Sequence, residues 1–266
     1  MDGGKLLQYS LKIFQVFILL FLLAPITTVV LISLDPRDYI AGFPPYLSLR
    51  WFEYFINYDS FMKGLSTSLR VSGLTMVLSL LVGMLASIAL TRYSFKGRDV
   101  LSNFFLSPLI IPAVVSGVAL LTLFRRIGFT DSLFNLVIGH LIITLPYSIR
   151  SISTVLMGLD KTLEEAAKGL GASEFRTFLH ITLPLIKPGI VASLIFSFAV
   201  SINDYAVSVF LSDVRNYMFS AALFAYLKAV FDPAIAVAST LLMSMTLLMV
   251  FIMDKVVGLE RSVGLR

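Results

Sequence analysis

Asp204 is the residue that most directly suggests chemistry, because it is the only acidic residue well inside an apolar run of this chain. A charge inside a membrane is costly and is expected to face a water-filled path or a partner helix. Four serines flank it at helical spacing, so a continuous helix would carry all five side chains on one face: Ser193, Ser197, Ser201 and Ser208. This pattern predicts a pathway for a polar solute, lined by Ser197, Ser201, Asn203, Asp204 and Tyr205.

The serine pattern has a second interpretation, which is close packing of helices through small residues. This alternative fits the serines better than it fits Asp204, since packing does not require a charge. Counted from Pro188 at about 1.5 Å per residue, Asp204 lies about 24 Å from the inner end of its span. We therefore expect it in the outer half of the membrane.

Enzymatic chemistry finds little support in the chain. It contains no cysteine and no G-x-x-x-x-G-K-[ST] phosphate loop, and neither H-E-x-x-H nor G-x-S-x-G occurs. The two histidines, His140 and His180, lack the spacing of a zinc site. We expect no enzymatic activity, no metal and no cofactor bound by this chain, and a structural role for His140 as a hydrogen-bonding partner of a neighbouring helix.

The stretch 161–190 carries the densest mixture of charges and predicts two short helices joined at a glycine. Thr162 and Glu165 have the spacing of a capping box at the start of the first helix. Gly171 can end that helix in a left-handed conformation, and Ser173 can cap the second helix. A charged helix–turn–helix between apolar spans is suited to docking into another protein.

The elements that must position these residues are transmembrane helices. The chain has 266 residues, of which 58% are hydrophobic and only 14% are charged, and its apolar runs are long enough to cross a bilayer. Thirteen of the 21 Lys and Arg residues lie in segments that face the cytoplasm if both termini are inside, which favours that orientation. We predict an all-α membrane protein with six spans, at about 13–34, 67–91, 101–124, 133–157, 186–211 and 233–256, around an inner segment 161–184.

Two further features concern the connections between spans. The loop 35–66 is rich in aromatic residues, including the single tryptophan Trp51, and favours an interfacial belt or a docking surface for an external partner. A short interfacial helix is expected at 49–57. Pro108 and Pro112 predict a kink in the third span, either beside a pathway or for packing.

The central segment resembles a known family motif. Glu165-Ala166-Ala167, then Gly171, then Ile181, Leu183 and Pro184 match the spacing of the EAA motif of binding-protein-dependent ABC importer permeases. The resemblance extends over nearly the whole chain. It is greatest to the second permease of spermidine/putrescine importers, around 92–97, 165–175 and 201–210, although Asn203 stands where we expect a second acidic residue beside Asp204.

The resemblance implies the type I ABC importer permease fold in a bacterial inner membrane. It also implies that an ATPase is contacted by Glu165, Ala166, Ala167, Gly171 and Ala172. The implied partners are a second, similar permease, two cytoplasmic ATPase subunits that use ATP, an external binding protein and membrane lipid, with no nucleic acid.

The cargo that the resemblance implies is a polyamine. An amino acid, opine, phosphonate or ferric iron remains an alternative, since the external binding protein selects the substrate. A self-contained secondary transporter is the alternative from another class. It would require more ion-coupling carboxylates or paired broken helices.

Overall fold

The computed structural model describes residues 3–40 and 42–257, and all the regular structure within them is helical. Arg261 and Arg266, which count among the inner-side cations, lie outside the described residues. The elements are α1 (Gly3–Ser33), α2 (Arg50–Asn57), α3 (Asp59–Arg92), α4 (Arg98–Leu106), η1 (Ser107–Leu109), α5 (Ala113–Arg126), α6 (Ser132–Gly158), α7 (Lys161–Gly169), α8 (Glu174–Thr177), η2 (Phe178–Thr182), α9 (Leu183–Leu185), α10 (Lys187–Asn203), α11 (Ser208–Leu211), α12 (Phe219–Ala229) and α13 (Ala234–Val257).

Four helices in the described part of the chain are long and apolar enough to cross a membrane, namely α1, α3, α6 and α13. Two bent helix pairs bring the number to six if each pair forms one broken span. The six-span count and the orientation with both termini inside remain predictions.

The third predicted span is broken. The helical segment Arg98–Leu109 and the helix Ala113–Arg126 meet at an angle of 107°. Pro112 stands at the break with extended backbone angles, φ −55° and ψ 131°, and caps α5. Because proline donates no backbone hydrogen bond and restricts the residue before it, the chain cannot continue as one helix through 110–112. The kink predicted from Pro108 and Pro112 is confirmed.

The fifth predicted span differs from the expectation of one helix over 186–211. Helix α10 ends at Asn203, Asp204 is extended with φ −68° and ψ 128°, and helix resumes only at Ser208. The prediction that Asp204 and Ser208 share a continuous helix face with the earlier serines is therefore wrong. The physical reason is that the Asp204 carboxylate accepts from the backbone amides of Val207 and Ser208, both at 3.0 Å, and so competes with the helical ladder.

The chain forms two compact units. The first comprises 1–62 with 223–244, and the second comprises 63–222 with 245–266. In the first unit, the short helix expected at 49–57 is confirmed as α2 (Arg50–Asn57), and its interfacial position remains a prediction. The indole Nε1 of Trp51 donates to the carbonyl oxygen of Arg37 at 3.0 Å. The Tyr226 ring packs edge-on against Tyr58 and Phe61 and belongs to α12, a short helix that was not predicted.

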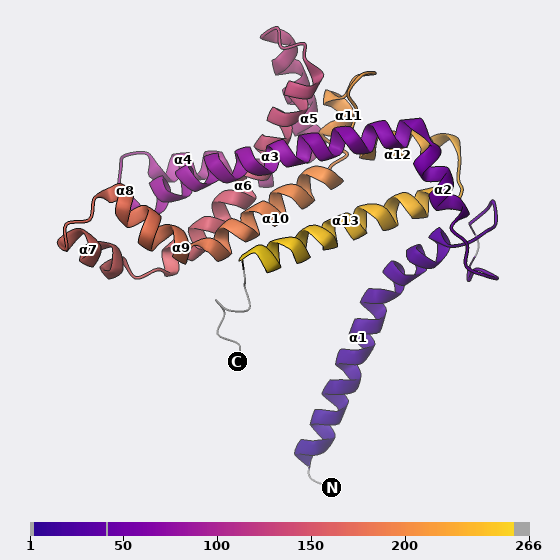
Figure 1. Cartoon of the computed structure of the whole chain (residues 1–266), viewed down its shortest axis with the longest axis horizontal. Coiled ribbons are helices and arrows are strands. Elements are labelled where there is room, and N and C mark those ends of the chain that lie inside the picture. The colour runs from indigo at the N-terminus through magenta and orange to yellow at the C-terminus, as the bar shows by residue number, and fades with distance from the viewer. Residues whose placement is uncertain (1–2, 41, 258–266) are drawn as a thin grey trace. The chain divides into compact units, whose positions relative to one another are not determined.

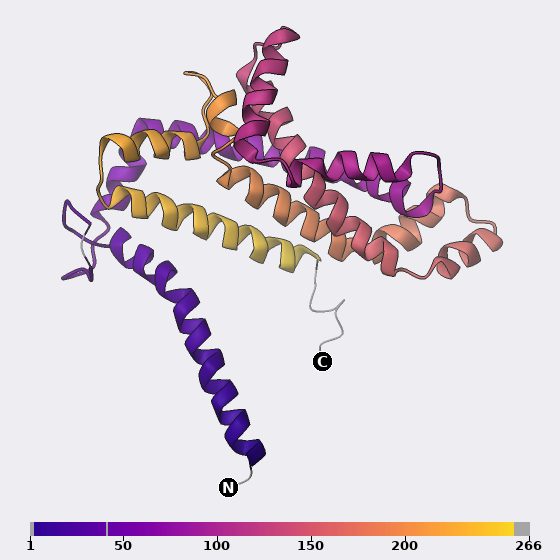
Figure 2. The same ribbon diagram turned by 180° about the vertical axis from the view of Figure 1, so that it is seen from behind.

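In the second unit, α3, α6 and α10 run side by side (Figures 1 and 2). Small residues allow the close approach. A Cβ atom on Gly83 of α3 would lie 2.6 Å from Ser148 Cβ on α6, and one on Gly189 of α10 would lie 2.9 Å from the Ser151 carbonyl oxygen. Side chains at these two positions would therefore push the helices apart.

At one end of these helices lie α7, α8 and α9 (Figure 1). The residues of η2 form a π-helical turn between α8 and α9. The helical segment Glu174–Leu185 then meets α10 at an angle of 68°. Pro184 lies inside this segment, in the first turn of α9.

Candidate functional site

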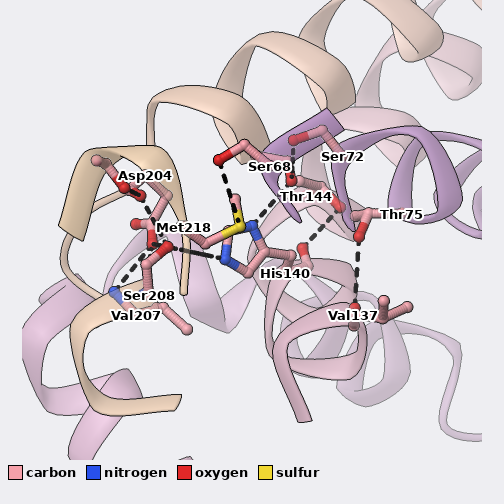
Figure 3. A network of polar contacts seen from close by, with 12 residues as sticks. Ser68, Ser72, Thr75, Val137, His140, Thr144, Asp204, Val207, Ser208 and Met218 are labelled. Carbon is pink, nitrogen blue, oxygen red and sulfur yellow. Dashed lines mark hydrogen bonds and ion pairs between the residues drawn. The ribbon is translucent and has the colours of Figure 1, made fainter. Parts of the chain in front are cut away.

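His140 lies at the centre of a buried polar network between α3, α6 and α10 (Figure 3). Its Nδ1 is 2.8 Å from Ser201 Oγ, and its Nε2 is 3.1 Å from Ser208 Oγ. Ser201 in turn donates to Ser72 of α3 at 3.0 Å. Each ring nitrogen of His140 therefore has a serine hydroxyl group within hydrogen-bond distance. The predicted hydrogen bond from His140 to a neighbouring helix is confirmed.

A second cluster of hydroxyl groups lies further along the same three helices. Ser148 Oγ of α6 is 2.7 Å from Ser79 of α3, 2.9 Å from Ser197 and 2.7 Å from Ser193 of α10. All four side chains are buried. Together with the bonds around His140, these contacts form a ladder of polar cross-links, which holds the helices at close distance.

The ladder bears on the predicted pathway residues. Ser197 and Ser201 are fully buried at 0% exposure and point into the helix packing, which favours the packing interpretation for both. Asn203, at the end of α10, is exposed, and its amide nitrogen donates to the Ala199 carbonyl oxygen at 2.8 Å. Asp204 and Tyr205 are partly exposed. The structure thus separates the serines from the three residues at the helix break.

Asp204 has a structural task that its position in the sequence does not reveal. Its Oδ2 accepts from the amides of Val207 and Ser208 and from the Ser208 hydroxyl group at 3.2 Å, and its side chain is 9% exposed. The same oxygen lies 3.9 Å from His140 Nε2. The Asp204 carboxylate therefore holds the turn that leads into α11, and it also lies beside the buried histidine.

The predicted coupling segment begins differently from the expected capping box. Asp160, not Thr162, caps α7, and its carboxylate accepts from the Thr162 amide at 2.9 Å. This bond, with a further one from the Thr162 side chain, holds the pKa of Asp160 below its usual value. Helix α7 starts at Lys161, so Glu165 stands too far into the helix to complete a capping box.

The end of α7 agrees with the prediction. Gly171 has φ +90°, its amide donates to the Lys168 carbonyl at 2.9 Å, and the Ala172 amide donates to the Ala167 carbonyl at 3.0 Å. These two bonds define a Schellman motif. The Ser173 hydroxyl group accepts from the Arg176 amide at 3.3 Å and caps α8, as predicted.

The surface of this segment is open to a partner. Glu165, Ala166 and Gly171 are exposed, and Ala167 and Ala172 are half-buried. Two apolar side chains beside them were missed from the sequence: Leu170 is 90% exposed and Phe175 is 70% exposed. Large apolar groups on an exposed turn are typical of an interaction site.

A groove of about 680 Å³ runs between the end of α3 and this segment, and Arg92, Lys161, Glu164, Phe175 and Phe178 are among its lining residues. Arg92 Nη2 donates to Glu164 Oε1 at 3.1 Å, across 72 residues of sequence. The spacing of these two residues gives no local signal of this pair, so sequence patterns alone could not find it.

Comparison with known proteins places this architecture among transport components. Residues 79–258 match the family described as binding-protein-dependent transport system inner membrane component. The matched range includes α6, the charged segment 161–184 and the helix break at Asp204.

The spermidine/putrescine transport system permease protein PotC of Haemophilus influenzae is 32% identical over 203 residues, which cover 76% of this chain and 79% of that protein. PotC of Escherichia coli is 27% identical over 261 residues, covering 98% and 97% of the two chains. A chain of a bacterial ABC transporter that imports the acidic polysaccharide alginate superposes with a TM-score of 0.71 at 16% identity, covering 97% of each chain. This last similarity shows a shared fold.

Proposed function

We infer the function from one premise, which is that this chain belongs to the family of binding-protein-dependent transport system inner membrane components. It is a permease subunit of an ABC importer and a multi-pass protein of the bacterial inner membrane. We propose that its cargo is a polyamine, spermidine or putrescine. The observation that supports this choice of cargo is similarity to a spermidine/putrescine permease across 98% of the chain.

The charge at the end of α10 supports a cationic cargo. Asp204 is partly exposed at a helix C-terminus, where unpaired carbonyl groups also attract cations. Asn203 and Tyr205 flank it with further polar groups. We propose that these three residues contact the solute, while Ser197 and Ser201 set the spacing of the helices behind them.

The assembly that we propose contains a second, similar permease, two cytoplasmic ATPase subunits and an external binding protein. The exposed surface of α7 and its C-terminal turn is the contact for the ATPase, through Glu165, Ala166, Ala167, Gly171 and Ala172. ATP-driven closure of the ATPase pair moves this surface as a rigid body and opens or closes the path.

Cargo is tested most directly on the external binding protein of the proposed assembly. Its thermal unfolding is measured with spermidine, putrescine, amino acids, an opine, a phosphonate and ferric iron, since a ligand at 100 times its Kd stabilises by about 2.7 kcal/mol. Stabilisation by a polyamine alone supports the proposed cargo. Stabilisation by another solute replaces it and leaves the importer assignment intact.

Assembly is tested by purification in detergent. We expect an ATPase and a second permease to co-purify with this chain, and proteoliposomes holding all subunits to import [14C]spermidine only when ATP and the loaded binding protein are present. Import by this chain alone would favour a self-contained secondary transporter and would contradict the proposed assembly.

A further inference from the structure

Glu164 and Glu165 are neighbours on α7 but have different surroundings. Glu165 is exposed, whereas Glu164 is half-buried and directed toward its own chain. Its Oε1 accepts from Arg92 Nη2 at 3.1 Å and from Thr182 Oγ1 at 2.8 Å. Arg92 is the last residue of α3, and Thr182 is the last residue of η2. One carboxylate oxygen therefore joins three separate elements.

Helix α7 lacks the apolar anchoring that normally fixes a helix on its neighbours. None of its nine residues is buried. A second ion pair, between Lys168 and Glu174, links it to α8, but the two side chains are 43% and 76% exposed. Exposed pairs contribute little to stability. The position of α7 consequently depends on the sheltered contacts of Glu164.

The Arg92–Glu164 pair is well shielded from solvent. The two side chains are 12% and 17% exposed, so salt screens their attraction less than it screens a surface pair. Arg92 Nε is buried and has no hydrogen-bond partner. Because a guanidinium group can bind a carboxylate through two parallel bonds, a second bond between Arg92 and Glu164 is open to this pair.

We propose that Arg92, Glu164 and Thr182 are positioning residues that tie α7 to α3 and, through η2 and α9, to α10. A displacement of α7 by the ATPase is then delivered to two membrane helices together. The two adjacent carboxylates then have different roles. Glu165 contacts the ATPase, and Glu164 contacts the membrane helices of its own chain. This inference rests on the proposed coupling role of α7.

The test uses the complete importer in proteoliposomes and measures the ATP hydrolysed for each [14C]spermidine imported. Glu164→Gln and Arg92→Gln each raise this ratio at least about fivefold, the lower range of typical coupling energies. Glu164→Gln keeps the side-chain volume, and both variants co-purify with the ATPase in normal amount. The reversed pair Arg92→Glu with Glu164→Arg restores the ratio to within about twofold of the wild type, since interacting residues are not additive.

Lys168→Ala is the matched control, because it removes the exposed ion pair between Lys168 of α7 and Glu174 of α8. We expect it to leave the ratio within about twofold of the wild type. The proposal is overturned if the single variants keep the wild-type ratio, or if the reversed pair is no better than they are. Thr182→Val removes one of the two bonds to Glu164 and gives an intermediate ratio.

A second measurement does not depend on the cargo. The chain has no cysteine, so spin labels can be placed at Thr162→Cys on α7 and Tyr93→Cys beside Arg92. In the wild-type protein, ATP binding leaves the distance between the two labels unchanged, because α7 and the end of α3 move together. In Glu164→Gln, ATP binding changes this distance. The same response of the label distance to ATP in both proteins would overturn the proposed role of Arg92, Glu164 and Thr182. Absence of spermidine uptake by a wild-type complex that hydrolyses ATP would instead overturn only the cargo.

Discussion

The imidazole Nδ1 of His140 lies 2.8 Å from the hydroxyl oxygen of Ser201, which is 61 residues further along the chain. This contact links α6 to α10 within the ladder of buried hydroxyl groups. Replacing His140 by Ala leaves a cavity and removes one buried hydrogen-bond partner from each of Ser201 and Ser208. We expect a loss of about 2–4 kcal/mol in the free energy of unfolding.

Thermal unfolding of the detergent-solubilised protein measures this effect. His180→Ala is the control, because His180 is exposed and bonds only to the carbonyl oxygen of Arg176 on its own segment. A change of less than about 0.5 kcal/mol is expected there. Equal effects of the two substitutions would contradict the structural role of His140.

Gly171 tests the importance of the turn after α7. Its φ of +90° strains any residue with a Cβ atom, yet a Cβ built there meets no heavy atom within 4 Å. Gly171→Val therefore acts through the backbone, because a left-handed conformation costs a residue with a Cβ atom about 1–2 kcal/mol. The backbone is expected to change conformation and so to displace the exposed surface of α7 and its C-terminal turn. We expect ATP hydrolysis to continue with little uptake while the protein remains in the membrane.

Gly169 provides the matched control for Gly171. It lies in the last turn of the same helix, and a Cβ there also meets nothing within 4 Å, but it has no positive φ. Gly169→Ala should keep normal uptake. If Gly171→Val also transports normally, the turn is not part of the coupling surface.

Asp204 is expected to combine two roles that different substitutions separate. Asp204→Asn keeps an oxygen that can accept from the amides of Val207 and Ser208 but removes the charge. We expect normal assembly and at least about a tenfold loss of spermidine uptake, which corresponds to 1.4 kcal/mol. Asp204→Ala also loses the hydrogen bonds to these two amides and destabilises the protein by about 1 kcal/mol.

Asp213 offers a comparison for Asp204, since it also accepts backbone hydrogen bonds, from Arg215 and Asn216 at 2.9 and 2.6 Å, but lies in an exposed loop. Asp213→Asn should transport as the wild type does. Unchanged uptake by Asp204→Asn would show that Asp204 has only the structural role.

Gly189 is expected to control the distance between α10 and α6. A Cβ there would lie 2.9 Å from the Ser151 carbonyl oxygen and 3.1 Å from Ile152 Cα. Because backbone atoms cannot move aside cheaply, Gly189→Leu should destabilise the protein by about 1–3 kcal/mol or more. Gly73→Leu, where a Cβ meets nothing within 4 Å, should be tolerated in the same thermal unfolding assay.

Local signals in the sequence were sufficient for several elements. The spacing of Gly171 and Ser173 predicted the turn and the second cap, and the aromatic loop predicted α2, because each depends on nearby backbone groups. Pro108 and Pro112 predicted the kink for the same reason. These features are determined within a few residues and survive in any tertiary context.

The features that were missed depend on contacts distant in sequence or on competition between neighbours. Apolarity continues through 186–211, so nothing in the composition marks Asn203 as a helix end; the side chain of Asp204 decides it. Asp160 and Thr162 are both good caps, and the choice between them follows from where α6 ends. The pairing of Arg92 with Glu164 and of Ser79 with Ser148 requires helices that are adjacent only in the fold.

The π-helical turn at Phe178–Thr182 has a consequence for the length of the chain. A π-helical turn contains one residue more than the regular helix around it, and each residue of an α-helix turns the chain by about 100°. Deleting a single residue from this turn would therefore leave α8 and α9 helical but rotate α7 and its exposed carboxylate, Glu165, by about a quarter of a circle relative to α10. The register between the proposed ATPase contact and the proposed transport path is thus set by the number of residues in this connection, as well as by their identity.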